Sequence, residues 1–127
     1  MDAAVAKKLR FTGRKKPAVI NAPDGYDVPG AATKLTGTFD FVQVFVRNEA
    51  ELAKLAPKAV AALEPEGILW ISFPKGSSRI QTDLTRDKGW DSVRKMPLKW
   101  ITLVSVDETW SAFGMRPLKK GEEPSQW

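Results

Sequence analysis

Two almost uninterrupted apolar runs constrain the fold of this chain more than any other feature of its sequence. Phe39–Val46 (FDFVQVFV) and Ile68–Phe73 (ILWISF) are rich in β-branched and aromatic residues, which favour β-strands. A strand with one solvated face alternates apolar and polar residues, whereas a strand covered on both faces reads as a continuous apolar run. We therefore expect two buried strands at the centre of a sheet whose two faces are both covered.

The segment between these runs predicts a helix. Asn48 is a favourable N-cap, and Glu51 three residues later gives an Asn variant of the capping box. Pro57 lacks a backbone N–H, so we expect a kink or a break into two short helices there. Small and apolar residues then follow at helical spacing: Leu52, Leu55, Ala56, Ala59 and Leu63.

The rest of the chain supplies shorter elements. We expect a helix over residues 2–9, a short buried strand over 17–22, a loop over 24–38, and a helix over 84–95 capped by Asp83 or Thr85. Trp100–Val106 and Trp110–Met115, joined through Asp107, predict a β-hairpin. This order predicts a small Rossmann-like α/β fold with a mostly parallel sheet and a C-terminal antiparallel β-hairpin at its edge.

One domain accounts for the chain. Its 127 residues, 43% of them hydrophobic, suffice for a single core. We place that domain at residues 1–117, with residues 1–16 as a basic N-terminal helix and loop, and expect the charged tail 118–127 to be frayed despite Trp127.

The composition excludes several kinds of chemistry. The chain has no His and no Cys, which removes disulfides, thiol catalysis, zinc sites of the usual kind and every imidazole-dependent triad. Its N-terminus lacks the apolar segment of a secretory signal, and no run approaches the length of a membrane span. We therefore expect a cytoplasmic protein without a membrane partner and without a bound metal.

The formal net charge of +5 is unevenly distributed. Residues 1–16 hold six Lys or Arg against Asp2 alone, a local charge of +5, whereas the remaining residues hold 14 basic and 14 acidic side chains. Residues 75–99 hold seven basic and three acidic side chains, a local charge of +4. Short basic clusters of this kind are most often solvated surface, although they can attract phosphates or nucleic acid.

The order of elements resembles the C-terminal half of a Rossmann-like methyltransferase domain. The resemblance rests on a strand with Asp40 near its start, a helix, a Leu-x-Pro-x-Gly turn (Leu63 to Gly67) into a buried strand, and a final hairpin. Methyltransferases of this kind carry a Gly-rich turn after their first strand, where the backbone approaches S-adenosylmethionine. The corresponding turn here, Asn21 to Gly25 (NAPDG), has one Gly and a Pro, and no acidic residue for the cofactor's ribose can be placed. We therefore expect no cofactor.

A second resemblance covers nearly the whole chain. Several separated motifs together are similar to the small bacterial family named domain of unknown function 3052, and they imply its fold and a bacterial cytoplasmic origin without an established activity. The motifs are Lys7-Lys8-Leu9, Asn21-Ala22-Pro23-x-Gly25-Tyr26, Gly67-x-Leu69-Trp70-Ile71-Ser72-x-Pro74-Lys75, Ser77-Ser78, Thr82-Asp83-Leu84 and Val106-Asp107-x-Thr109-Trp110-Ser111-Ala112.

Candidate binding residues follow from the sheet. Ligands of open α/β sheets bind beyond the carboxyl ends of parallel strands, and that rule selects three loops. The first holds Asn21 and Asp24, and the second holds Arg47 and Asn48. The third loop suits an anion best, because a Gly beside two Ser, between two cations, supplies N–H groups, hydroxyls and positive charge. The predicted anion or ligand site comprises Asn21, Asp24, Lys75, Gly76, Ser77, Ser78 and Arg79.

No catalytic set stands out. Asp83 and Asp107 read more readily as a helix cap and a turn residue than as acids or bases, and the Trp residues read as core. Trp90 follows Lys88-Gly89 and is the Trp that could instead anchor a partner or a dimer contact. We therefore interpret the chain as a non-catalytic binding or regulatory module for an anionic small molecule or a partner protein, with homo-oligomerisation open. The alternatives are a minimal transferase-like enzyme completed by oligomerisation and a nucleic-acid accessory protein, the latter disfavoured because the aromatic residues sit inside apolar runs.

Overall fold

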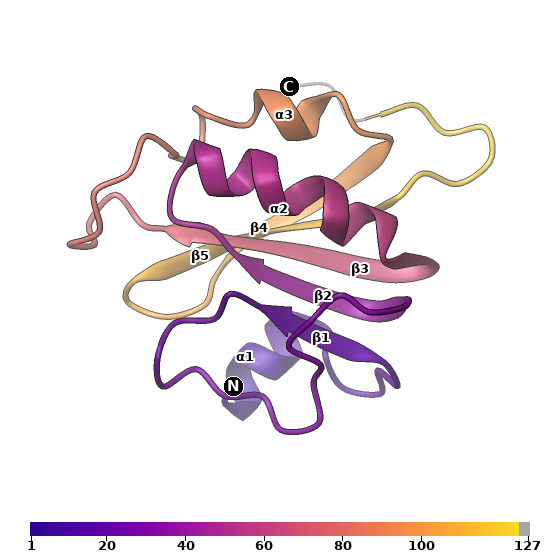
Figure 1. Ribbon diagram of the computed structural model, residues 1–127, viewed down its shortest axis with the longest axis horizontal. Helices are drawn as coiled ribbons and strands as arrows, with labels where there is room; N and C mark the ends of the chain where they lie inside the picture. The colour runs from indigo at the N-terminus through magenta and orange to yellow at the C-terminus, as the bar shows by residue number, and fades with distance from the viewer. Residues whose placement is uncertain (125–127) are drawn as a thin grey trace.

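The computed structural model describes residues 1–124 and shows a mixed α/β structure built on one sheet (Figure 1). In these residues the sheet has five strands in the spatial order β1-β2-β3-β5-β4. The elements in chain order are α1 (Ala3–Lys8), β1 (Pro17–Ile20), β2 (Phe39–Phe45), α2 (Glu49–Ala61), β3 (Leu63–Pro74), α3 (Asp91–Arg94), β4 (Leu98–Ser105) and β5 (Trp110–Pro117). The α/β class and the two central buried strands are confirmed. β3 begins at Leu63, however, so the expected turn from Leu63 to Gly67 is instead the start of this strand.

The strands change direction within the sheet. β1, β2 and β3 pair in parallel, whereas β5 pairs antiparallel with β3 on one side and with β4 on the other. Two reversals return β4 to the direction of the first three strands, so the carboxyl ends of β1 to β4 lie at one end of the sheet, on the left of Figure 1. The expected C-terminal hairpin therefore lies at one edge of the sheet, with β4 outermost and β5 between β3 and β4.

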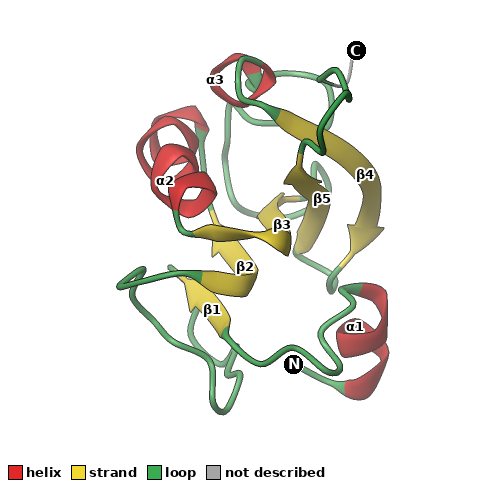
Figure 2. Cartoon of the chain, turned by 90° about the vertical axis from the view of Figure 1, so that its right-hand side faces the viewer, coloured by secondary structure: helices red, strands yellow, loops and turns green. Residues whose placement is uncertain are grey.

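The sheet buries both of its faces. Figure 2 shows α2 and α3 on one side of it and α1 on the other. On the first side, Val44 of β2 shares a core with Leu52 of α2. On the second side, Trp70 of β3 shares a core with Leu9, and its indole N–H donates a hydrogen bond to the Leu9 carbonyl at 2.8 Å. The two apolar faces that the runs predicted thus each receive a helix.

Trp90 belongs to the core rather than to a partner surface. Its side chain is fully buried, and its ring lies edge-on to Phe73, Trp100 and Phe113 with centroid separations of 5.0–5.5 Å. Edge-to-face contacts at these separations are favourable for aromatic rings. The polar residues that precede Trp90 belong to a turn over this aromatic cluster, which corrects the alternative interpretation of Trp90 as an exposed anchor.

The helix expected over residues 84–95 is mostly a loop. Only Asp91–Arg94 is helical, because Thr85 ties the preceding residues into a turn: its hydroxyl accepts the N–H groups of Asp87 and Lys88. Gly89 then adopts a φ of +96°, a left-handed conformation that an α-helix cannot contain. Both features stop a helix from forming before residue 91.

Pro57 does not break α2, which runs without interruption from Glu49 to Ala61. A proline deprives the carbonyl four residues earlier of its donor, and here that residue is Ala53. Ala53 is exposed, so water can satisfy its carbonyl. The opposite side of the helix buries Leu52 and Ala56 in the core, which favours a continuous helix.

The basic N-terminal segment is held against the sheet. The backbone N–H groups of Lys15 and Lys16 donate to the two carboxylate oxygens of Asp40 at 2.8 and 2.9 Å, and the Arg14 guanidinium donates to the Asp40 carbonyl at 3.2 Å. Lys16 also forms an ion pair with Glu64 at 3.2 Å. The segment is therefore part of the folded structure rather than a free basic arm.

The start of the charged C-terminal tail is also held, contrary to the expectation of fraying from residue 118. Arg116 forms a bidentate pair with Glu122, with both N–O distances 2.8 Å, and the pair lowers the pKa of Glu122 to about 2. The Lys119 N–H donates to the same carboxylate. Trp127 lies outside the described residues.

Among residues 1–124, none of the helices combines the length and apolarity needed to cross a bilayer.

Gly114 of β5 is required by the packing of Trp70. A Cβ at this position would lie 2.7 Å from Cζ3 of the fully buried Trp70 ring, which has no room to move. We therefore expect Gly114→Ala to lower the free energy of unfolding by about 1–3 kcal/mol, measured by urea denaturation. The control is Gly76→Ala, whose Cβ would meet nothing within 4 Å. Equal urea midpoints for the two variants would contradict this packing.

Candidate functional site

Four connections meet where the carboxyl ends of the strands lie. They are residues 21–25 after β1, residues 47–48 after β2, residues 75–79 after β3, and the turn 106–109 between β4 and β5. The connection after β3 and the β4–β5 turn project from the left of the sheet in Figure 1. The rule that selected the first three loops is general to open α/β sheets, and the position of β4 adds the fourth.

Among the predicted site residues, Asn21 has a structural role. It adopts a left-handed φ of 60°, and its side-chain amide donates to the Phe45 carbonyl at 2.8 Å, which ties the end of β1 to the end of β2. It lines a groove of about 290 Å³ beside α2, together with Glu51 and Lys54. Asn48 is the N-cap of α2, as expected, with its side-chain oxygen accepting the Glu51 N–H at 2.9 Å.

The connection after β3 encloses a hollow of about 560 Å³. We call it the basic hollow, because two cations line it and no acidic side chain from the described part of the chain does. Asp83 lies within the same segment, but its carboxylate accepts the backbone N–H of Glu49 at 2.8 Å and so caps α2 rather than the helix that follows it in sequence. The residues that line the basic hollow are Lys75, Gly76, Ser78, Arg79, Ile80, Gln81, Thr82, Leu84 and Thr85.

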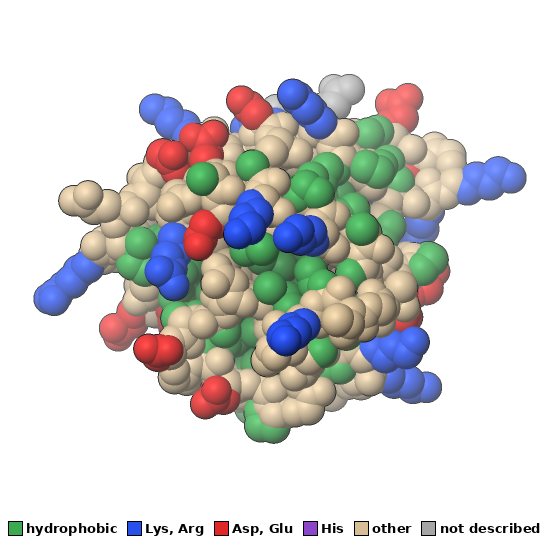
Figure 3. All heavy atoms as spheres, viewed as in Figure 1, with side chains coloured by type: hydrophobic (Ala, Val, Ile, Leu, Met, Phe, Trp, Pro, Cys, Tyr) green, Lys and Arg blue, Asp and Glu red, His purple; other side chains and the backbone are tan. Residues whose placement is uncertain are grey.

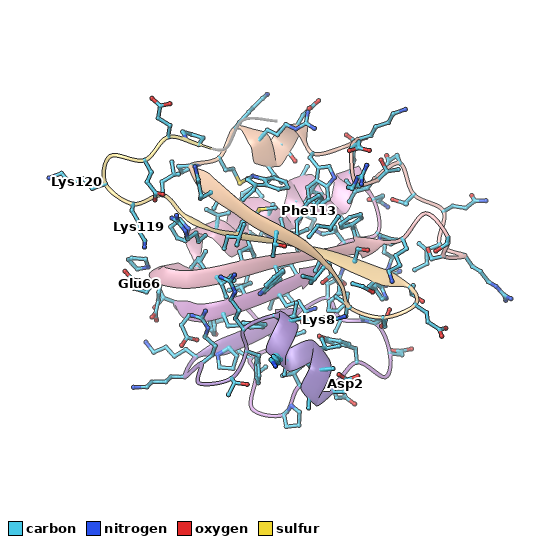
Figure 4. All side chains as sticks on the ribbon, turned by 180° about the vertical axis from the view of Figure 1, so that it is seen from behind. Asp2, Lys8, Glu66, Phe113, Lys119 and Lys120 are labelled. Carbon is cyan, nitrogen blue, oxygen red and sulfur yellow. The ribbon has the colours of Figure 1, made fainter. Side chains whose placement is uncertain are left out.

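Lys75 lines this hollow and is held by two contacts to the β4–β5 hairpin. Its backbone N–H donates to the Thr109 carbonyl at 2.8 Å, and its ammonium donates to the Ser105 hydroxyl at 2.6 Å. Lys8, at the end of α1 (Figure 4), donates to the Ser105 carbonyl at 3.3 Å. An ammonium has three donors, so Lys75 keeps two after its bond to the neutral hydroxyl.

The other members of the predicted loop differ in their surroundings. Ser78 donates its N–H to the Lys75 carbonyl at 2.9 Å, while its hydroxyl oxygen is buried and has no hydrogen-bond partner among residues 1–124. Arg79 is exposed and makes no ion pair or hydrogen bond within the described chain. Gly76 lines the hollow, whereas Ser77 is exposed and does not.

Asp24 lines a second hollow of about 390 Å³, which we call the acidic hollow. Its other carboxylate belongs to Asp107 of the β4–β5 turn. Asp107 Oδ1 accepts the N–H groups of Thr109 and Trp110 at 2.8 and 2.9 Å, the turn role that its position predicted. Ile80 lines both hollows, so the basic and acidic hollows adjoin.

A buried polar chain lies beside the acidic hollow. The Tyr26 hydroxyl donates to Gln43 Oε1 at 2.7 Å, and Gln43 Nε2 donates to the Ser72 hydroxyl at 3.0 Å. Gln43 and Ser72 are fully buried on neighbouring strands. Sequence reasoning missed this chain, although one signal was present: each of these two residues is a polar interruption of a buried apolar run.

Burial raises the pKa of Tyr26 to about 12, and the carboxylates of Asp107 and Asp2 act in the same direction. Tyr26 therefore stays protonated and keeps its hydrogen bond across the neutral pH range.

Among residues 1–124, no three His, Cys, Asp or Glu side chains are grouped so as to hold a metal ion. The described residues of the site can therefore contact a ligand through charged groups, hydrogen-bonding groups and apolar side chains.

Comparisons with known proteins support the fold. No family model and no curated protein matches the chain by sequence, so membership of the domain of unknown function 3052 family stays a prediction. Among solved structures, TehB from Haemophilus influenzae is similar with a TM-score of 0.54 at 9% identity, over 93% of this chain and 63% of TehB. LepI in complex with SAM gives 0.52, and a LepI variant in complex with SAH and a substrate analogue gives 0.53, both at 8% identity.

The match with LepI covers 91% of this chain but only 40% of LepI, so the chain spans less than half the length of LepI. The likeness supports a methyltransferase-like α/β fold, as the order of elements predicted, and at 8–9% identity it shows the fold alone.

The residues after β1 do not fit a nucleotide cofactor of the Rossmann type. Such a cofactor needs a glycine-rich turn that leads from the first strand into a helix. Here residues 21–38, between β1 and β2, contain no helix. The Asn21 amide is already bonded to Phe45, and Pro23 offers no N–H.

Tyr26 is the only tyrosine in the chain, so its titration can be followed directly by tyrosinate absorbance. We expect a midpoint near pH 12 in the folded protein and near 10 in urea. Because the folded-state pKa is the higher one, protonation of Tyr26 contributes its full stability below pH 10, and that stability is lost as the pH rises from about 10 to about 12. A folded-state midpoint near pH 10 would show that Tyr26 is solvated.

Proposed function

We propose that this chain is a non-catalytic binding module for an anionic small molecule, and that the anion occupies the basic hollow. The observation that carries the proposal is that Lys75 and Arg79 line that hollow, whereas no acidic side chain of residues 1–124 does. The hollow lies beyond the carboxyl end of β3, the place where open α/β sheets bind ligands.

The donors in the hollow suit a phosphate or a carboxylate. Lys75 keeps two N–H donors, and Arg79 offers a guanidinium fork that can bind an anion through two parallel hydrogen bonds. The Ser78 hydroxyl has no hydrogen-bond partner among residues 1–124 and is a further donor for an anion oxygen. Gly76 leaves open space beside the backbone, so an anion can approach closely.

The arrangement of charge favours a small anion over a nucleic acid. Figure 3 shows basic and acidic side chains interspersed over the face that carries α2, instead of one basic surface. Part of the N-terminal basic segment is committed to the chain itself through Arg14, Lys16 and Lys8. Lys119 and Lys120 lie at the opposite end of the sheet from the basic hollow (Figure 4).

The likeness to LepI, whose structures hold SAM or SAH, favours a second candidate, a transferase-like enzyme completed by another subunit. The two candidates place their ligands differently. SAH would shift the amide NMR signals of residues 21–25 and 47–48, whereas a simple anion would shift those of residues 75–85.

The test compares two double variants. We expect Lys75→Gln/Arg79→Gln to weaken the binding of ethyl phosphate at least about tenfold, because two charge-assisted contacts are removed. Lys119→Gln/Lys120→Gln removes the same charge at the other end of the sheet and is the matched control. Amide chemical shifts followed during ethyl phosphate titration give both the affinity and the location. Equal weakening in the two variants, or unmoved amides at residues 75–85, would refute the proposal.

A further inference from the structure

We infer that the ligand is zwitterionic, with its anionic group in the basic hollow and a protonated amine in the adjoining acidic hollow. This inference rests on the proposed function, since it extends the same site and names the class of ligand. The class is a short apolar chain with a phosphate or carboxylate at one end and an ammonium group at the other.

The two hollows adjoin at Ile80 and carry opposite charges. The basic hollow presents Lys75 and Arg79, the acidic hollow presents Asp24 and Asp107, and Ile80 lines both. Their volumes of about 560 and 390 Å³ leave room for a charged group in each and for a short linker across Ile80.

These opposite charges do not neutralise each other. Among residues 1–124, no ion pair joins a cation of the basic hollow to a carboxylate of the acidic hollow. One residue on each side is held by neutral groups instead: Lys75 by the Ser105 hydroxyl, and Asp107 by the backbone N–H groups of Thr109 and Trp110. A single ligand with both charges can therefore pair with both sets without first breaking an ion pair.

The acidic hollow has free acceptors and an aromatic wall for an amine. Asp107 uses only Oδ1 for its turn, and Asp24 is exposed and accepts no hydrogen bond from the described residues. Tyr26 and Trp110 line the same hollow. The two carboxylates attract an ammonium group by a Coulombic contribution.

The test uses two homologous series of probes. The first contains ω-aminoalkyl phosphates with two, four and six methylene groups, and the second contains the n-alkyl phosphates of equal length. Isothermal titration calorimetry measures the ratio of affinities at each length. We expect the amine to tighten binding about fivefold at one length and less at the others, because a linker acts best when its length matches the span between the two sites.

Variants locate the effect of the amine. Asp24→Asn/Asp107→Asn removes both carboxylates yet keeps an oxygen at residue 107 for the Thr109 and Trp110 N–H groups. We expect the affinity ratio to fall to about one, with the binding of n-alkyl phosphates unchanged or slightly tighter. Asp24→Asn alone, which breaks no hydrogen bond among residues 1–124, should give a partial loss and covers the case in which the double variant unfolds. Glu66→Gln, at the far end of the sheet (Figure 4), is the matched control and should keep the full ratio.

The outcomes separate this inference from the proposed function. If n-alkyl phosphates bind at residues 75–85 but the amine adds nothing at any length, the zwitterionic ligand is refuted and the anion site stands. If neither series binds, the proposed function fails as well. An amine effect that persists in Asp24→Asn/Asp107→Asn would place the ammonium group elsewhere and overturn the inference.

Discussion

The parallel pairing of β2 with β3, buried on both faces, is the constraint on which the rest of this structure depends. Val42, Val44, Leu69 and Ile71 point to one face, and Phe41, Phe45 and Trp70 point to the other. Parallel neighbours require a crossover, and α2 supplies it while covering the first face. The second face needs its own cover, which α1 provides through Val5 and through the following residue Leu9, whose carbonyl accepts a hydrogen bond from Trp70. Burial on this scale is the main favourable contribution to folding.

The charged site follows from the same pairing. β3 continues to Pro74 against the first residue of β5, so Lys75 emerges directly beside the turn that carries Asp107 and Thr109. Because β4 returns in the direction of β3, that turn lies at the carboxyl end of the sheet rather than at the far end. Two loops of opposite charge, separated by about 30 residues in sequence, thereby share Ile80 as a common wall.

Whether a sequence prediction was correct depended on how far apart in the sequence the interacting residues lie. The Asn48 cap and the Asp107 turn involve partners within three residues, and both were predicted correctly. Asp83 was expected to cap its own helix, but it caps α2, whose first residue lies 34 positions earlier. The expected helix over 84–95 failed because Thr85 and Gly89 favour a turn that closes over the buried Trp90. The Tyr26–Gln43–Ser72 chain was missed because its members come from three separate elements.

The sequence by itself determined the class of fold, the two buried strands, the helix between them and the loops that could carry charge. These depend on apolar periodicity and on short-range caps, which local residue patterns specify. Only the tertiary structure decided that β5 lies inside the sheet, that the basic N-terminal segment is bound to Asp40, and that Asp24 and Asp107 meet beside the Lys75 loop. These depend on contacts between residues far apart in the chain. No local sequence pattern specifies which distant residue will pair with a strand edge or bond to a carboxylate.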